Sequence, residues 1–99
     1  MPAAFRTLLA QADLDHIWDY IAEDSPAAAD RFLTRLEKRC MALAEMPATG
    51  TPRPDIGAAV RCAPVNPYSV YYRPVDGGIE VLRVLHQARH LQRMTFPLQ

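Results

Sequence analysis

The sequence contains few of the residues that mark metal, disulfide or membrane proteins. Its 99 residues include only two cysteines, Cys40 and Cys62, and neither stands in a metal-ligand or redox spacing. We therefore expect free thiols in a reducing compartment. No apolar run approaches the ~18 residues that cross a membrane, and no charged leader precedes an apolar stretch. These absences predict a soluble, cytoplasmic protein without membrane contacts.

Glycine is scarce as well, and the four glycines form no nucleotide-binding pattern. The pair Gly77-Gly78 lacks the spacing and the following helix of a phosphate loop, so a turn is the better interpretation. His86 and His90 are four residues apart, but His86 lies at the end of a predicted strand and no Cys or Glu accompanies the two histidines. We expect no metal ion and no cofactor.

The chain has no net charge, because 11 basic residues balance 11 acidic ones. The field of the whole molecule therefore gives no reason to expect direct sequence-specific nucleic-acid binding or attraction to a membrane. The average hides an asymmetry, however. Between residues 10 and 24 there are five acids and no base, whereas from residue 51 to the end six arginines face three acids. The basic half is where we expect a partner to bind.

One compact domain, residues 1–99, fits this length and a hydrophobic content of 49%, which is enough for one modest core. Apolar residues recur at steps of three and four over residues 12–22, which predicts an amphipathic helix with an acidic outer face and Trp18 as a structural residue. Ser25-Pro26 then starts a second helix, whose apolar stripe includes Cys40 and which ends at Pro47. So short a turn predicts a helical hairpin. The apolar run over residues 4–9 fits either an edge strand or the entry to the first helix.

Three strand-like runs make up the second half, at residues 60–65, 68–73 and 79–86. Their short connections predict antiparallel neighbours. The predicted architecture is α+β: an αα-hairpin packed across one face of a small antiparallel sheet of three to four strands.

Arg83 stands in the middle of the last, apolar strand. Alternation places it on one face with Ile79, Val81 and Leu85, so a buried Arg83 needs an acidic partner. We predict a structural role for Arg83, with its partner on the acidic first helix. The candidates are Asp15, Asp19 and Glu23.

The other cations of this half are candidates for binding a partner, although solvated surface is the simpler interpretation of any single one. The candidate residues are Arg61, Arg73, His86, Arg89, His90 and Arg93.

Three stretches of the sequence resemble one known family: ADLDHIWDYIAEDSPAAADRF, LEKRCMALAEMPATG and YSVYYRPVDGGIEVLRVLHQAR. They resemble the ParE branch of the ParE/RelE superfamily of type II toxin-antitoxin toxins, over residues 12–89. The resemblance implies an N-terminal strand near residues 4–8, then the helical hairpin, then three antiparallel strands.

The chemistry that the resemblance implies depends on the branch, since RelE-like members cleave ribosome-bound mRNA and ParE-like members poison DNA gyrase. Arg61 and Arg89 match two basic positions of the RelE-like site. Ala63 and Ser69 occupy two others, and no tyrosine follows Tyr72. Without an acid and a base a phosphate can be held but hardly cleaved, and we assign no catalytic residue. Substitution by an imidazole, His86 or His90, remains an alternative.

The resemblance therefore implies a toxin that inhibits gyrase by binding, so blocking replication, and that a ParD-like antitoxin neutralises. Two alternatives stay open: a RelE-like ribosome-dependent mRNA endoribonuclease with a rearranged site, and a non-toxic antitoxin-binding module. The C-terminal apolar residues, Leu91, Met94, Phe96 and Leu98, are either a flap over the sheet or an exposed contact for a partner.

Overall fold

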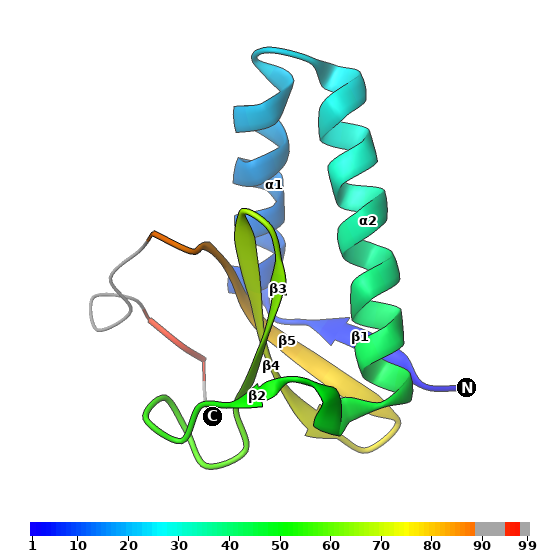
Figure 1. Ribbon diagram of the computed structural model, residues 1–99, viewed down its shortest axis with the longest axis vertical. Coiled ribbons are helices and arrows are strands. Elements are labelled where there is room, and N and C mark those ends of the chain that lie inside the picture. Colours follow the sequence, from blue (N-terminus) through cyan, green and yellow to red (C-terminus); the bar gives the residue numbers. More distant parts are fainter. Residues whose placement is uncertain (89–94, 98–99) are drawn as a thin grey trace.

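In the computed structural model, which describes residues 1–88 and 95–97, a helical hairpin lies across one face of a five-stranded sheet (Figure 1). The order along the chain is β1 (Ala3–Arg6), α1 (Leu8–Ala22), α2 (Pro26–Glu45), the 3-10 turn η1 (Pro47–Thr49), β2 (Thr51–Pro52), β3 (Arg61–Val65), β4 (Tyr68–Val75) and β5 (Gly78–His86). The predicted α+β architecture is confirmed. The predicted number of strands was too low, because the two-residue β2 is hidden in the proline-rich loop and carries no alternating pattern.

The sheet has the order β1-β5-β4-β3-β2 and is not purely antiparallel. Strands β2 to β5 pair antiparallel, as predicted, but β1 pairs with β5 in parallel and starts with Ala3 opposite Gly78. Gly78 has φ +146°, and a Cβ placed there would lie 1.9 Å from the carbonyl oxygen of Ala3. Only glycine lets the two backbones approach this closely.

Thr7 ends the first strand and starts the first helix. Its Oγ1 accepts a hydrogen bond from the Ala10 N–H at 3.0 Å and donates one to the Leu82 carbonyl at 2.9 Å. The strand therefore stops at Arg6, two residues before the end expected from the family resemblance, and the helix begins at Leu8.

The helical hairpin follows its sequence signals. Ser25 Oγ accepts from the Ala28 N–H at 3.1 Å, and Pro26 fills the first helical position. The half-buried Trp18 of α1 donates its indole N–H to Asp30 Oδ1 of α2 at 2.9 Å, which links the two helices at their outer end.

The core lies between the hairpin and one face of the sheet. Tyr72, Ile79 and Val70 are fully buried there. The Tyr72 hydroxyl donates to the Pro47 carbonyl at 2.7 Å and accepts from the Gly50 N–H at 2.8 Å, so it holds the turn that follows α2.

A bulge in β5 changes which side chains share a face. Tyr72 pairs with Val81 and Tyr71 with Arg83, so Leu82 is the extra residue. Val81 belongs to the core under the helices, whereas Arg83 lies across from Tyr71, on the other face. The predicted common face of Arg83 with Ile79 and Val81 is therefore wrong, because the bulge reverses the alternation.

Candidate functional site

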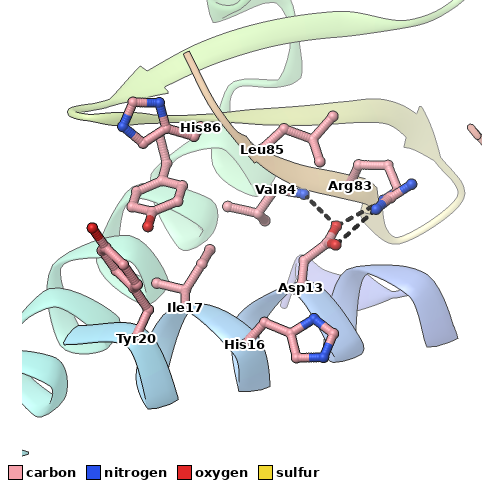
Figure 2. A pocket seen from close by; sticks show the side chains of 9 residues that line it. Asp13, His16, Ile17, Tyr20, Arg83, Val84, Leu85 and His86 are labelled. Carbon is pink, nitrogen blue, oxygen red and sulfur yellow. Dashed lines mark hydrogen bonds and ion pairs between the residues drawn. The ribbon is translucent and has the colours of Figure 1, made fainter. Parts of the chain in front are cut away.

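Arg83 forms a buried ion pair at the edge of the sheet. Its side chain is bidentate on Asp13 of α1, with Nε to Oδ2 at 2.7 Å and Nη2 to Oδ1 at 2.8 Å (Figure 2). Arg83 is only 8% exposed. Its hydrogen bond to Asp13 raises the pKa of the guanidinium above its usual value, so the side chain stays charged.

The partner of Arg83 is on the predicted helix but is not one of the predicted acids. Asp15, Asp19 and Glu23 all point to solvent. Asp13 stands four residues before the buried Ile17, at the border of the apolar stripe, and therefore faces the sheet.

Two further bonds make this ion pair a junction of three segments. Asp13 Oδ2 also accepts from the Val84 N–H at 3.0 Å, and Arg83 Nη1 donates to the Thr95 carbonyl at 2.7 Å. The ring of Phe96 packs edge-on against Tyr71, with centroids 5.4 Å apart. At residues 95–97, then, the C-terminal segment lies on the sheet, as a flap requires.

The rest of the predicted flap, Leu91, Met94 and Leu98, lies outside the described residues, and so do three of the predicted binding residues, Arg89, His90 and Arg93. The roles of all six stay predictions.

Beside the ion pair, α1 diverges from the end of β5 and leaves an open hollow of about 500 Å³, which we call the α1–β5 groove. Figure 2 shows His16 and Tyr20 of α1 on one side of it and His86 of β5 on the other. Its lining residues are Asp13, His16, Ile17, Tyr20, Tyr68, Arg83, Val84, Leu85 and His86.

The groove runs along an exposed edge of β5. Strand β1 pairs with β5 only from Gly78 to Val81. Because the Val84 N–H points away from β4, to Asp13, the backbone polar groups of His86, two residues on, point the same way. Because the Val84 N–H is occupied by Asp13, the backbone groups of His86 are those that an incoming extended segment would meet among the described residues of this edge.

The groove side chains are suited to binding. His86 packs its ring edge against Tyr68, with centroids 5.3 Å apart, and its Nδ1 accepts from the Ala88 N–H at 3.1 Å. The one carboxylate of the lining within residues 1–88 and 95–97, Asp13, is engaged by Arg83, so these described residues offer no free acid paired with a base.

Two predicted binding residues lie far from the groove. Arg61 Nη1 donates to the carbonyls of Ala48 and Gly50, at 3.1 and 2.7 Å. Arg73 forms a salt bridge with Glu80 at 2.8 Å. Both stand at the end of the sheet opposite His86, which pairs with the first residue of β4. The structure therefore separates the predicted basic surface into two parts.

Two of the positions that a RelE-like nuclease would use are buried, whereas Arg61 is half-buried and Arg89 lies outside the described residues. Ala63 is 1% and Ser69 is 7% exposed. Tyr72 is committed to the turn after α2, and burial is the main cause that raises the pKa of Tyr71, which packs against Phe96.

Analysis of the sequence missed three groove residues: His16, Tyr20 and Tyr68. A signal was available for the first two, since residues 13, 16, 17 and 20 recur at steps that share one helix face. That the face opens onto the end of β5 depends on the angle between α1 and the sheet, which no local pattern encodes.

Within residues 1–88 and 95–97, no helix is long and apolar enough to span a membrane. Over the same ranges, no three His, Cys, Asp or Glu side chains gather closely enough to hold a metal ion.

The chain is similar to known toxins. A family model described as ParE toxin of type II toxin-antitoxin system, parDE, matches residues 5–91. Toxin RelE2 of Caulobacter vibrioides is 39% identical over 83 residues, which cover 84% of this chain and 92% of that protein. Toxin ParE1 of the same organism is 36% identical over 81 residues, covering 80% and 82%. The solved structure of the chromosomal ParDE TA system from P. aeruginosa has a TM-score of 0.71 and 27% identity, over 87% of this chain and 96% of that one.

Proposed function

This chain belongs to the ParE toxin family of type II toxin-antitoxin systems, and we propose that it inhibits DNA gyrase by binding rather than by catalysis. The inhibited enzyme stays on cleaved DNA, which blocks replication. The toxin acts in the cytoplasm, where its target works.

The observation that carries this proposal is which residues occupy the RelE-like positions, and whether they are buried or already bonded. Ala63 and Ser69 supply no proton-transfer group and are buried. Arg61, the basic position that does match, has its Nη1 bound to two backbone carbonyls. A phosphoryl-transfer site needs a base, an acid and exposed cations around the phosphate. The described part of the chain offers no such set at these positions.

A ParD-like antitoxin is the proposed partner. Its tail, disordered alone, orders as it binds the helical hairpin and the sheet. We assign one extended stretch of that tail to the α1–β5 groove, where the backbone of His86 is the proposed source of hydrogen bonds and Tyr20 and His86 supply side-chain contacts. Arg61 and Arg73 remain proposed contacts for acidic residues of the tail.

A groove variant tests this assignment. Tyr20→Ala combined with His86→Ala removes two exposed side chains of the lining, and we expect antitoxin binding to weaken about tenfold or more. Asp19→Ala, on the solvent face of the same helix, is the matched control and should bind normally. If the groove variant and the Asp19→Ala control bind the antitoxin with equal affinity, the assignment of the tail to the groove is wrong.

A RelE-like endoribonuclease is the second candidate, favoured by one observation: the relative that is 39% identical carries the name RelE2. Induced expression in a bacterium, with growth, DNA breakage and message integrity followed together, distinguishes the two. Gyrase-dependent double-strand breaks with intact message support gyrase inhibition. Message cleavage without DNA damage supports the nuclease, and normal growth supports a non-toxic binding module.

A neighbouring reading frame gives a further test. We expect it to encode a small ribbon-helix-helix protein with an acidic tail.

A further inference from the structure

The arginines of the basic half are mostly occupied by the protein itself. In the described part of that half, four arginines all bond to protein groups: Arg53 to Asp55, Arg61 to the turn after α2, Arg73 to Glu80, and Arg83 to Asp13. The surplus of charge that the sequence shows there is largely used within the fold.

The cations of α2 are in the opposite situation. Arg31, Lys38 and Arg39 form no hydrogen bond or ion pair with any residue among 1–88 and 95–97. Arg35 uses one arm, Nη2, to donate to the Asn66 carbonyl at 2.6 Å, and lies over the ring of Phe32. Unbonded cations on a rigid element are available to a partner.

These four cations form one stripe, which we call the α2 stripe. At about 100° per residue, Arg31, Arg35, Lys38 and Arg39 fall within a sector of about 100° of the helix surface. Glu37, the one acid between Arg31 and Arg39, points away from that sector. The stripe is about 12 Å long at 1.5 Å per residue. Arg31, Arg35 and Lys38 are exposed, and Arg39 is half-buried.

The shape of the surface selects the kind of partner. Figure 1 shows the outer ends of α1 and α2 extending beyond the sheet, and at Arg35 the stripe meets the β3–β4 turn, where the Asn66 carbonyl accepts from that side chain. The exposed residues in line with the cations include the small Ala27 and Ala42, with Thr34 and Met41 at the border and one acid, Glu45, in the last turn of the helix beyond the stripe. A peptide tail that folds on binding needs apolar pockets. A polyanion needs charge and close approach.

We propose that the α2 stripe contacts the phosphate backbone of double-stranded DNA. This inference deepens, and rests on, the proposed action on gyrase, whose substrate is DNA. Phosphates of one strand advance about 3.4 Å along the duplex axis, so a 12 Å stripe meets about three of them. Arginine and lysine contacts of this kind fix position without reading sequence. The binding is therefore independent of base sequence, as a chain with zero net charge and no base-reading motif requires.

The test is direct binding of the purified chain to a labelled duplex of mixed sequence, followed by fluorescence anisotropy. With three phosphate contacts, affinity should fall about 40-fold between about 50 and 200 mM salt. Arg31→Gln with Lys38→Gln removes two contacts, so binding at low salt should weaken and the fall should shrink to about threefold. Arg6→Gln, an exposed arginine outside the stripe, is the matched control and should behave like the unaltered chain.

The proposal would be overturned by the absence of DNA binding by the unaltered chain at low salt, by the same salt dependence in the stripe variant, or by equal loss in the Arg6→Gln control. Binding of polyglutamate with the same affinity as DNA would assign the stripe to an acidic protein, and would also overturn it.

Gyrase-dependent plasmid cleavage, measured with the same variants, separates this proposal from the one on which it rests. Equal cleavage with the unaltered chain and the stripe variant would refute the DNA contact and leave gyrase inhibition standing. Stripe-dependent DNA binding without any cleavage would support the contact and refute gyrase as the target.

Discussion

Removal of Asp13 should destabilise the fold strongly, because it leaves a buried cation without a partner. Asp13→Ala takes away both oxygens that receive Arg83 and the acceptor of the Val84 N–H. Breaking a buried ion pair from one side costs roughly 3–5 kcal/mol. The two side chains are 10% and 11% exposed, so some water reaches them, and we expect about 3 kcal/mol, the low end of that range. That is a large share of the 5–15 kcal/mol typical of a domain.

Arg83→Met should be milder. It keeps an unbranched stem against the sheet, and Asp13 retains the Val84 N–H and its access to water, so we expect a loss of about 1–2 kcal/mol. The double variant should lose about as much as the larger single one or less, which gives a coupling energy of at least about 1–2 kcal/mol. If the fold survives, Arg83→Met should leave antitoxin binding largely intact.

Urea unfolding measures these changes, with the fluorescence of Trp18, the one tryptophan, as the signal. Asp15→Ala on the solvent face is the control and should stay within about 0.5 kcal/mol of the unaltered chain. Strictly additive effects of the two single variants, with coupling below about 0.5 kcal/mol, would refute the view that this ion pair acts as one buried unit.

Three other predictions concern the sheet and the core. Gly78→Ala should lower the free energy of unfolding by at least about 3 kcal/mol, because its Cβ would collide with the backbone of β1. Gly77→Ala, with φ +83° but no neighbour within 4 Å, should lower it by about 1–2 kcal/mol. Chemical denaturation measures both losses, and equal losses would contradict the close approach of the strands. Tyr72→Phe should cost about 2 kcal/mol by the same measurement, since it leaves two backbone groups of the turn after α2 without their partner. The Tyr20 side chain is 70% exposed, so Tyr20→Phe should cost almost nothing. No loss of stability in Tyr72→Phe would show that water replaces the hydroxyl. Burial raises the pKa of the Cys40 thiol from 9.0 to about 11, so between these pH values the folded state keeps a proton that the unfolded state loses. The free energy of unfolding should therefore decline by about 2–3 kcal/mol as the pH rises from 9 to 11. Cys40→Ala should remove that decline, and an unchanged decline would assign it to other groups.

Local patterns were sufficient to predict the helices and the three long strands. Ser25-Pro26 marks the turn of the hairpin, and its side chain caps α2 as the sequence implies. Periods of 3.6 and 2 identify buried faces because burial at those periods is what makes a helix or strand stable on a core. The strand β2, two residues long, is too short to carry any period.

Arg83 shows where local reasoning reaches its limit. That it needs an acid follows from its place in an apolar strand, and the correct helix was predicted. The correct residue was not, because the bulge at Leu82 turns Arg83 to the other face of the sheet, where it reaches the edge and meets Asp13. A bulge depends on pairing between strands, so a single strand's sequence does not reveal it.

The predicted binding residues show a second limit. Charge counted along the chain pointed to the second half, yet Arg61, Arg73 and Arg83 bond within the fold, whereas three cations of α2 have no partner among the described residues. Composition counts charges and does not say which are neutralised by neighbours in space. Of the three predicted binding residues that the structure describes, His86 lies at the α1–β5 groove, and Arg61 and Arg73 do not.

The central claim is that this ParE-family toxin acts on gyrase by binding, without a catalytic site of its own. A reconstituted reaction with purified gyrase, supercoiled plasmid and ATP tests it most directly, with the purified chain added and the products treated with detergent and protease. The account predicts that linear plasmid accumulates in proportion to the chain and only when gyrase is present, while ribosome-bound message incubated with the same preparation stays intact. Cleavage of that message, with no linear plasmid, would contradict it.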